Sequence, residues 1–130
     1  MESDDEDGAF EMVSHLLALG HRRILNIAGM ADLAGAEARV RGYQRAHAAA
    51  GVKPPPAHLV RAPFTVEGGR DAMEVWLRRH RGKPLPDAVF AGNDGIAHGC
   101  MDALRIRGLR VPADISPLCG APTRGVPESR

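Results

Sequence analysis

The stretch FEMVSHLLALGHRRILNIAG, residues 10–29, predicts a helix followed directly by a strand. Four apolar residues in its first half share one helical face: Phe10, Val13, Leu16 and Leu17. The acidic run before residue 8 favours a helix start, and Gly20 suits a left-handed helix end, so we predict a helix over 8–19. The apolar, β-branched segment ILNIAG, residues 24–29, predicts a short buried strand.

The same order of helix and strand recurs along the rest of the chain. Three more helices are marked by apolar residues at helical spacing: Val40, Tyr43, Ala46 and Ala50; Ala72, Met73, Trp76 and Leu77; Ile96, Cys100, Ala103 and Leu104. Gly51 and Gly108 end the first and the last of these helices. Strands are predicted at 58–62, after the loop formed by three prolines, and at 87–92. One βα unit therefore occupies about 30 residues.

This alternation predicts an α/β fold, a doubly wound parallel sheet of three to four strands with helices on both faces. In such sheets, ligands bind beyond the carboxyl ends of the strands. The segments that leave the three predicted strands are 28–39, 63–69 and 92–95. If the chain binds a small molecule, we expect these segments to line the site.

The strand exits contain four residues suited to recognition: Arg39, Phe64, Asn93 and Asp94. An aromatic face can stack on a sugar or a base, and the polar groups can hydrogen-bond hydroxyl or carboxylate groups. Three of them also have a simpler interpretation: Asp94 as a helix N-cap, Arg39 as a surface arginine, and Phe64 as loop packing. The four residues together predict binding rather than catalysis.

Composition excludes several classes of protein. The 130 residues suffice for one modest domain or part of a larger one, and no apolar run is long enough for a membrane span. The acidic start is unlike a secretory signal, and Cys100 and Cys119 form no CxxC pair. A net charge of +1 gives no general attraction to nucleic acid or membranes. We therefore expect a cytoplasmic protein.

Catalytic and metal-binding motifs do not occur in the sequence. A P-loop, a GxGxxG turn and a GxSxG elbow are all missing, which weakens the common classes of α/β enzyme. The six histidines do not pair with one another or with cysteine at metal-binding spacing. We expect no enzymatic activity, no metal and no cofactor.

Three segments resemble the LacI/GalR family of bacterial transcriptional regulators: HLLALGHRRILNIAG at 15–29, ARVRGYQRAHAAAG at 38–51, and PDAVFAGNDGIAHGCMDALRIRGLRVPADIS at 86–116. The resemblance runs in unbroken order over roughly residues 4–116. It implies part of the C-terminal lobe of a sensor shaped like periplasmic binding proteins, spanning 1–116. Family members hold a small effector, here a sugar or a nucleoside-like molecule, between two lobes.

The resemblance also assigns roles to residues and partners. The arginine of the R-x-x-G-aromatic motif corresponds to Arg39, the aromatic after the second strand to Phe64, and the Asn-Asp pair to Asn93 and Asp94. Operator DNA would be bound only through a helix-turn-helix that this chain lacks, and no membrane is involved. We expect the intact regulator to form a homodimer through an apolar surface around Val66, Met73 and Met101. These three residues could instead pack on the sheet.

The family pattern is lost after Ser116. Family members continue into a fourth apolar strand and a G-[FY]-D-[DN] motif, whereas this chain continues as PLCGAPTRGVPESR. We expect a truncated lobe without that strand, with residues 117–130 as a divergent, disordered tail. Two other functions stay open: a sugar-binding protein of a transport system, and a small flavodoxin-like domain.

Overall fold

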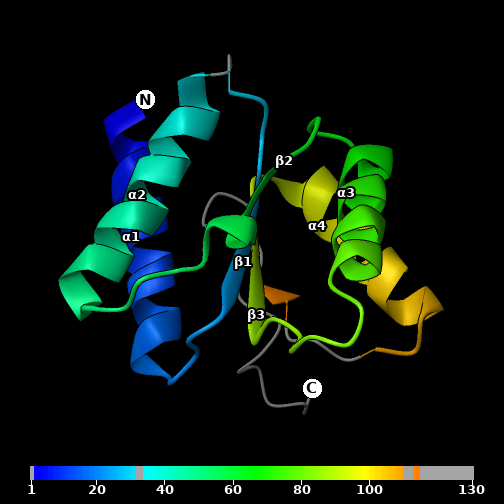
Figure 1. Cartoon of the computed structure of the whole chain (residues 1–130). Helices are drawn as coiled ribbons and strands as arrows, with labels where there is room; N and C mark the ends of the chain where they lie inside the picture. Colours follow the sequence, from blue (N-terminus) through cyan, green and yellow to red (C-terminus); the bar gives the residue numbers. More distant parts are fainter. Residues whose placement is uncertain (1, 32–33, 110–112, 115–130) are drawn as a thin grey trace, which may run out of the picture.

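A computed structural model of the chain describes residues 2–31, 34–109 and 113–114. Helices and strands alternate along it (Figure 1) in the following order: α1 (Glu2–Ala18), β1 (Ile24–Ala28), α2 (Ala34–Ala50), the 3₁₀ turn η1 (Pro56–His58), β2 (Leu59–Arg61), α3 (Val66–Arg79), β3 (Ala88–Ala91), α4 (Asp94–Ile106) and β4 (Ala113–Asp114). The order predicted from the sequence is therefore confirmed.

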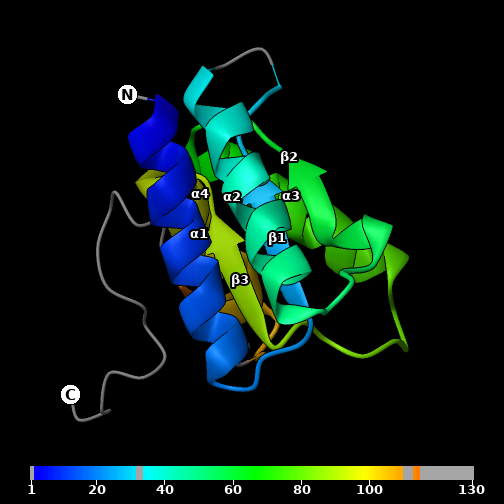
Figure 2. The ribbon, with the colours of Figure 1, turned by 90° about the vertical axis from the view of Figure 1, so that its left-hand side faces the viewer.

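The strands form one parallel sheet in the order β2-β1-β3-β4. Helices α1 and α2 cover one face of the sheet, and α3 and α4 cover the other (Figures 1 and 2). The predicted doubly wound α/β fold is confirmed, because central strands buried on both faces need helices on both sides.

The core has two parts because successive strand residues point to opposite faces of the sheet. Leu25 and Ile27 pack toward α3 and α4, while Ile24 and Phe90 pack toward α1 and α2. All four side chains are fully buried. This explains why the two central strands read as continuous apolar runs rather than as alternating patterns.

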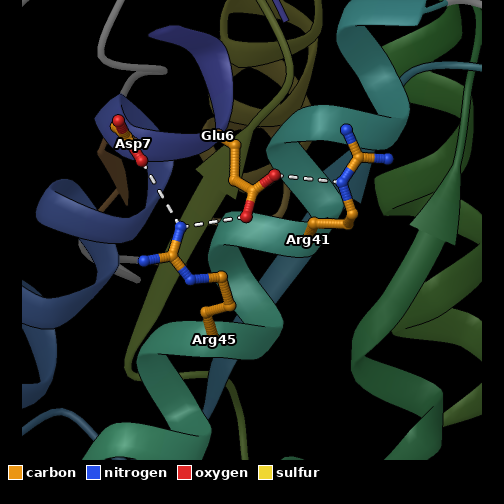
Figure 3. A network of polar contacts seen from close by, with 4 residues as sticks. All are labelled: Glu6, Asp7, Arg41 and Arg45. Carbon is orange, nitrogen blue, oxygen red and sulfur yellow. Dashed lines mark hydrogen bonds and ion pairs between the residues drawn. The ribbon is translucent and has the colours of Figure 1, made fainter. Parts of the chain in front are cut away.

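Helix α1 begins at Glu2, six residues before the predicted start at residue 8. Its acidic first turns are paired with α2 (Figure 3): Glu6 accepts hydrogen bonds from Arg41 at 3.0 Å and from Arg45 at 2.9 Å. Asp7 accepts a third, from Arg45 at 3.4 Å. The Arg41 and Arg45 hydrogen bonds lower the pKa of Glu6. The acidic run therefore attaches α1 to its neighbour as well as favouring a helix start.

Two expectations about buried and exposed side chains need correction. Ala50 is exposed, and His47 takes the buried position in the last turn of α2. Met73 is fully buried in the core, so it cannot belong to a dimer surface. The sheet has a fourth strand, β4, in which Ala113 pairs with Val89 of β3, so it has the larger of the predicted numbers of three to four strands. The apolar strand that family members form after Ser116 would fall outside the described residues.

The predicted tail at 117–130 lies outside the described residues. Among the residues that the structure describes, no helix is long and apolar enough to cross a membrane.

Two buried histidines lie near the amino ends of the strands, opposite the strand exits. His47 Nδ1 lies 2.9 Å from the carbonyl oxygen of Tyr43 and donates to it, which leaves Nε2 buried without a hydrogen-bond partner among the described residues. The pKa of His47 is lowered, chiefly because burial disfavours the charged ring. The pKa of His58 is also lowered by burial, and then by the positive charges of His80 and Arg23.

These lowered pKa values predict that the fold loses stability in mild acid. The unfolded chain takes up protons near the ordinary histidine pKa of 6.5, whereas the folded chain resists protonation. The two neutral histidines therefore contribute their full stabilisation of the fold above pH 6.5, and this stabilisation is lost as the pH falls below 6.5. Urea unfolding at a series of pH values between 7.5 and 5 checks this. His47→Gln should reduce the slope, and substitution of the exposed His98 should not.

Candidate functional site

The four residues singled out in the sequence come from all three strand exits. Arg39 lies in the second turn of α2, Phe64 lies between β2 and α3, Asn93 follows β3, and Asp94 is the first residue of α4. All of them lie at the carboxyl edge of the sheet. Direct contacts link the first three, and Asp94 stands apart.

Arg39 is a buried arginine, with 9% of its surface exposed, so the interpretation as a surface residue is wrong. Its Nη2 lies 3.6 Å from Oδ1 of Asp5 in α1. Its guanidinium carbon lies 6.0 Å from the centre of the Phe64 ring, within the range of a cation–π contact. Arg39 Nε is buried and has no hydrogen-bond partner among the described residues. The side chain is therefore held in place while one donor stays unused.

The ring of Phe64 lies over the glycines that end two neighbouring strands. A Cβ added at Gly29 would lie 2.4 Å from the ring atoms Cε1 and Cζ, and one added at Gly92 would lie 3.1 Å from Cε1. A Cβ at Gly29 would therefore displace the ring, and one at Gly92 would require it to shift by a few tenths of an ångström. Phe64 is only half-buried, so it combines loop packing with a partly open aromatic face.

Asn93, rather than Asp94, caps α4. Its Oδ1 accepts a hydrogen bond from the Ile96 amide at 2.9 Å, and its Nδ2 donates to the Phe64 carbonyl at 3.5 Å. The amide therefore joins the third strand exit to the second. Asp94 is exposed, and its carboxylate forms no hydrogen bond or ion pair with another described residue. The interpretation of Asp94 as the N-cap is wrong, and its carboxylate is open to solvent.

Two charged residues at this edge were not predicted from the sequence. Asp5 pairs with Arg39, but nothing in the acidic run distinguishes it from its neighbours. Arg61, at the end of β2, donates to the Gly29 carbonyl at 3.1 Å and pairs with Glu37 of α2 at 2.9 Å. In the sequence, the position of Arg61 at the end of a predicted strand was the one feature that could have indicated this role.

A groove of about 700 Å³ lies along β2 between η1 and α3, and it reaches the carboxyl end of β2 at Arg61 and Thr65. Its lining includes Leu59, Val75, Trp76 and His80, and none of the four predicted residues. The ring of His80 stacks on that of Trp76 with 4.1 Å between centres, which fills one side of the groove. Much of its surface is apolar, although Arg61, Glu67 and Asp71 also line it. Because the groove includes neither Arg39 nor the Phe64 ring, the carboxyl edge is the better candidate.

Comparison with known proteins shows the family to which the chain belongs. Residues 13–124 match the model of the periplasmic binding protein-like domain. The HTH-type transcriptional regulator DegA of Bacillus subtilis is 36% identical over 113 residues, which cover 87% of this chain and 32% of DegA. The chain thus spans about a third of the length of the curated relatives that it matches.

Solved structures agree with the sequence matches. A sugar-binding transcriptional regulator of the LacI family from Escherichia coli, complexed with phosphate, is 30% identical with a TM-score of 0.79, over 86% of this chain and 40% of that one. The transcriptional regulator CelR in complex with cellobiose is 33% identical with a TM-score of 0.76, over 86% of this chain and 34% of CelR. The chain belongs to the periplasmic binding protein-like domain family, and its relatives are LacI-family transcriptional regulators.

Proposed function

We propose that this chain is the effector-sensing part of a LacI-type transcriptional regulator, and that it binds a small polar molecule at the carboxyl edge of its sheet. Arg39, Phe64, Asn93 and Asp94 form the binding surface. In the whole regulator, the bound effector would control binding to operator DNA, and the protein would act as a homodimer.

The unused donor of Arg39 carries this proposal. Buried polar groups in proteins are nearly always hydrogen-bonded, and a buried donor without a partner costs roughly 1–3 kcal/mol. Arg39 Nε is such a donor, and the half-open ring of Phe64 lies beside it. A hydroxyl-bearing molecule could accept from Arg39 Nε while its apolar face rests on the ring. These two features support ligand binding over a purely structural role.

The other contacts support recognition rather than turnover. Asn93 is fixed as the cap of α4, with the exposed carboxylate of Asp94 next to it in the chain. Among relatives, CelR is described in complex with cellobiose, and its sugar makes neutral saccharides the first class to test. The relatives are transcriptional regulators, which supports this proposal over a transport protein or an enzyme.

A ligand screen on the purified chain tests the proposal. Neutral mono- and disaccharides and nucleosides are added singly, and binding is detected by saturation-transfer NMR and by a rise in the unfolding midpoint. We expect a subset of these molecules to bind and to raise the midpoint with increasing concentration, as mass action requires. A chain that binds none of them, or that converts one to a product, would contradict the proposal.

A further inference from the structure

The carboxyl edge contains two arginines, and each already has a carboxylate partner. Arg39 pairs with Asp5, and Arg61 pairs with Glu37. Asp94 adds a third, unpaired carboxylate. The described side chains of this edge therefore carry more negative than positive charge, although an isolated arginine would suggest an anion site.

The carboxylate of Asp5 also lies at the N-terminus of α2. A Cβ added at Gly35, in the first turn of α2, would lie 2.9 Å from Asp5 Oδ2 and 3.8 Å from Arg39 Nη1. The first turn of a helix favours negative charge, because its amide groups and the helix dipole point toward it. The Asp5 side chain is 15% exposed. A carboxylate of the protein thus sits where an anionic group of a ligand would otherwise be most stable.

A ligand with its own negative charge would meet two unfavourable effects. Arg39 is already neutralised by Asp5, so it offers less attraction than a free guanidinium. The new anion would also be repelled by Asp5 in a partly desolvated setting, where charges interact more strongly than in water. A hydroxyl group avoids both effects, since it accepts from Arg39 Nε without adding charge.

We infer that Asp5 makes this site selective for neutral, hydroxyl-bearing ligands and excludes their phosphorylated or carboxylated forms. Asp5 is then a residue that sets specificity through charge. This inference rests on the proposed function, because it concerns the ligand of that same site. It goes further in naming the charge class of the ligand and the residue that imposes it.

Inorganic phosphate is the probe for the test, and Asp5→Asn is the variant, because asparagine keeps the shape of aspartate without its charge. Phosphate is titrated into both chains at constant ionic strength, and binding is read from the NMR signals of Arg39 Nε–H and the Gly35 amide. We expect Asp5→Asn to bind phosphate at least about tenfold more tightly than the original chain, with saturating shifts at these two signals. Glu11→Gln removes one exposed charge from the same helix, and it should bind phosphate as the original chain does.

Three results would overturn the inference: equal phosphate affinity in the original chain and Asp5→Asn, no phosphate binding in either, or shifts confined to residues away from Arg39. If Asp5→Asn does not fold, Asp5→Ser replaces it with the same expectations. Failure of the proposed function would be seen separately, as the absence of binding by every neutral molecule in the screen.

Discussion

Replacing Arg39 by methionine is expected to weaken binding of a neutral ligand by about 10- to 150-fold. A hydrogen bond to a charged group contributes roughly 1.5–3 kcal/mol, and each 1.4 kcal/mol changes the dissociation constant tenfold. Methionine keeps much of the length of arginine but has no donor. The ligand found in the screen is titrated into the original chain and Arg39→Met by calorimetry. Arg45→Met is the matched control, since Arg45 also pairs with acidic residues and lies over an aromatic ring, that of Phe10.

Arg39→Met also leaves Asp5 without its cation, so part of the effect could come from lost stability. The double variant Arg39→Met with Asp5→Asn separates the two causes, because removing both partners of a buried pair is less costly than removing one. We expect the double variant to recover thermal stability but not ligand binding. Recovery of both would show that Arg39 acts through the fold and does not contact the ligand.

Replacing Gly99 by alanine is expected to destabilise the fold by about 2–3 kcal/mol, which is large against a total of roughly 5–15 kcal/mol for a domain. Gly99 lies where α4 crosses α3, and a Cβ there would lie 2.1 Å from the Val66 carbonyl oxygen and 2.4 Å from the Arg70 amide nitrogen. Both atoms belong to the backbone, so the two helices must move apart. At an open helical site, the same substitution would stabilise by about 0.5–1 kcal/mol.

Denaturant unfolding of Gly99→Ala and of His98→Ala measures this effect. His98 is the exposed neighbour of Gly99 in α4, so its replacement should leave the midpoint almost unchanged. Gly99→Ala should unfold at a clearly lower denaturant concentration with the same slope. A Gly99→Ala chain as stable as His98→Ala would mean that α3 and α4 are not packed this closely.

The order of elements could be predicted because each helix and strand carries its own signal. Gly20, Gly51 and Gly108 all have positive φ angles at helix ends, as their positions suggested. The start of α1 could not be predicted, because it depends on Arg41 and Arg45, which are far from it in the sequence. The buried place of His47 was likewise decided by packing, since histidine is a weak indicator of burial.

The site was predictable only in part, for a similar reason. The rule that ligands bind at strand exits selected Arg39, Phe64 and Asn93, and the structure links these three by contact. The same rule cannot find Asp5, which lies in the first helix and reaches the edge only through tertiary packing. Asn93 caps α4 instead of the predicted Asp94, because the helix begins one residue earlier than the sequence pattern suggested.

The most direct test of the proposed binding site is an NMR titration that follows the Nε–H signal of Arg39. The unaltered, isotope-labelled chain is titrated with the tightest neutral ligand from the screen. The site described here predicts a saturating shift of this signal, accompanied by shifts of the Phe64 ring and the Asn93 side-chain amide at the same dissociation constant. Saturating shifts confined to the groove of Trp76 and His80, with the Arg39 signal unchanged, would contradict it.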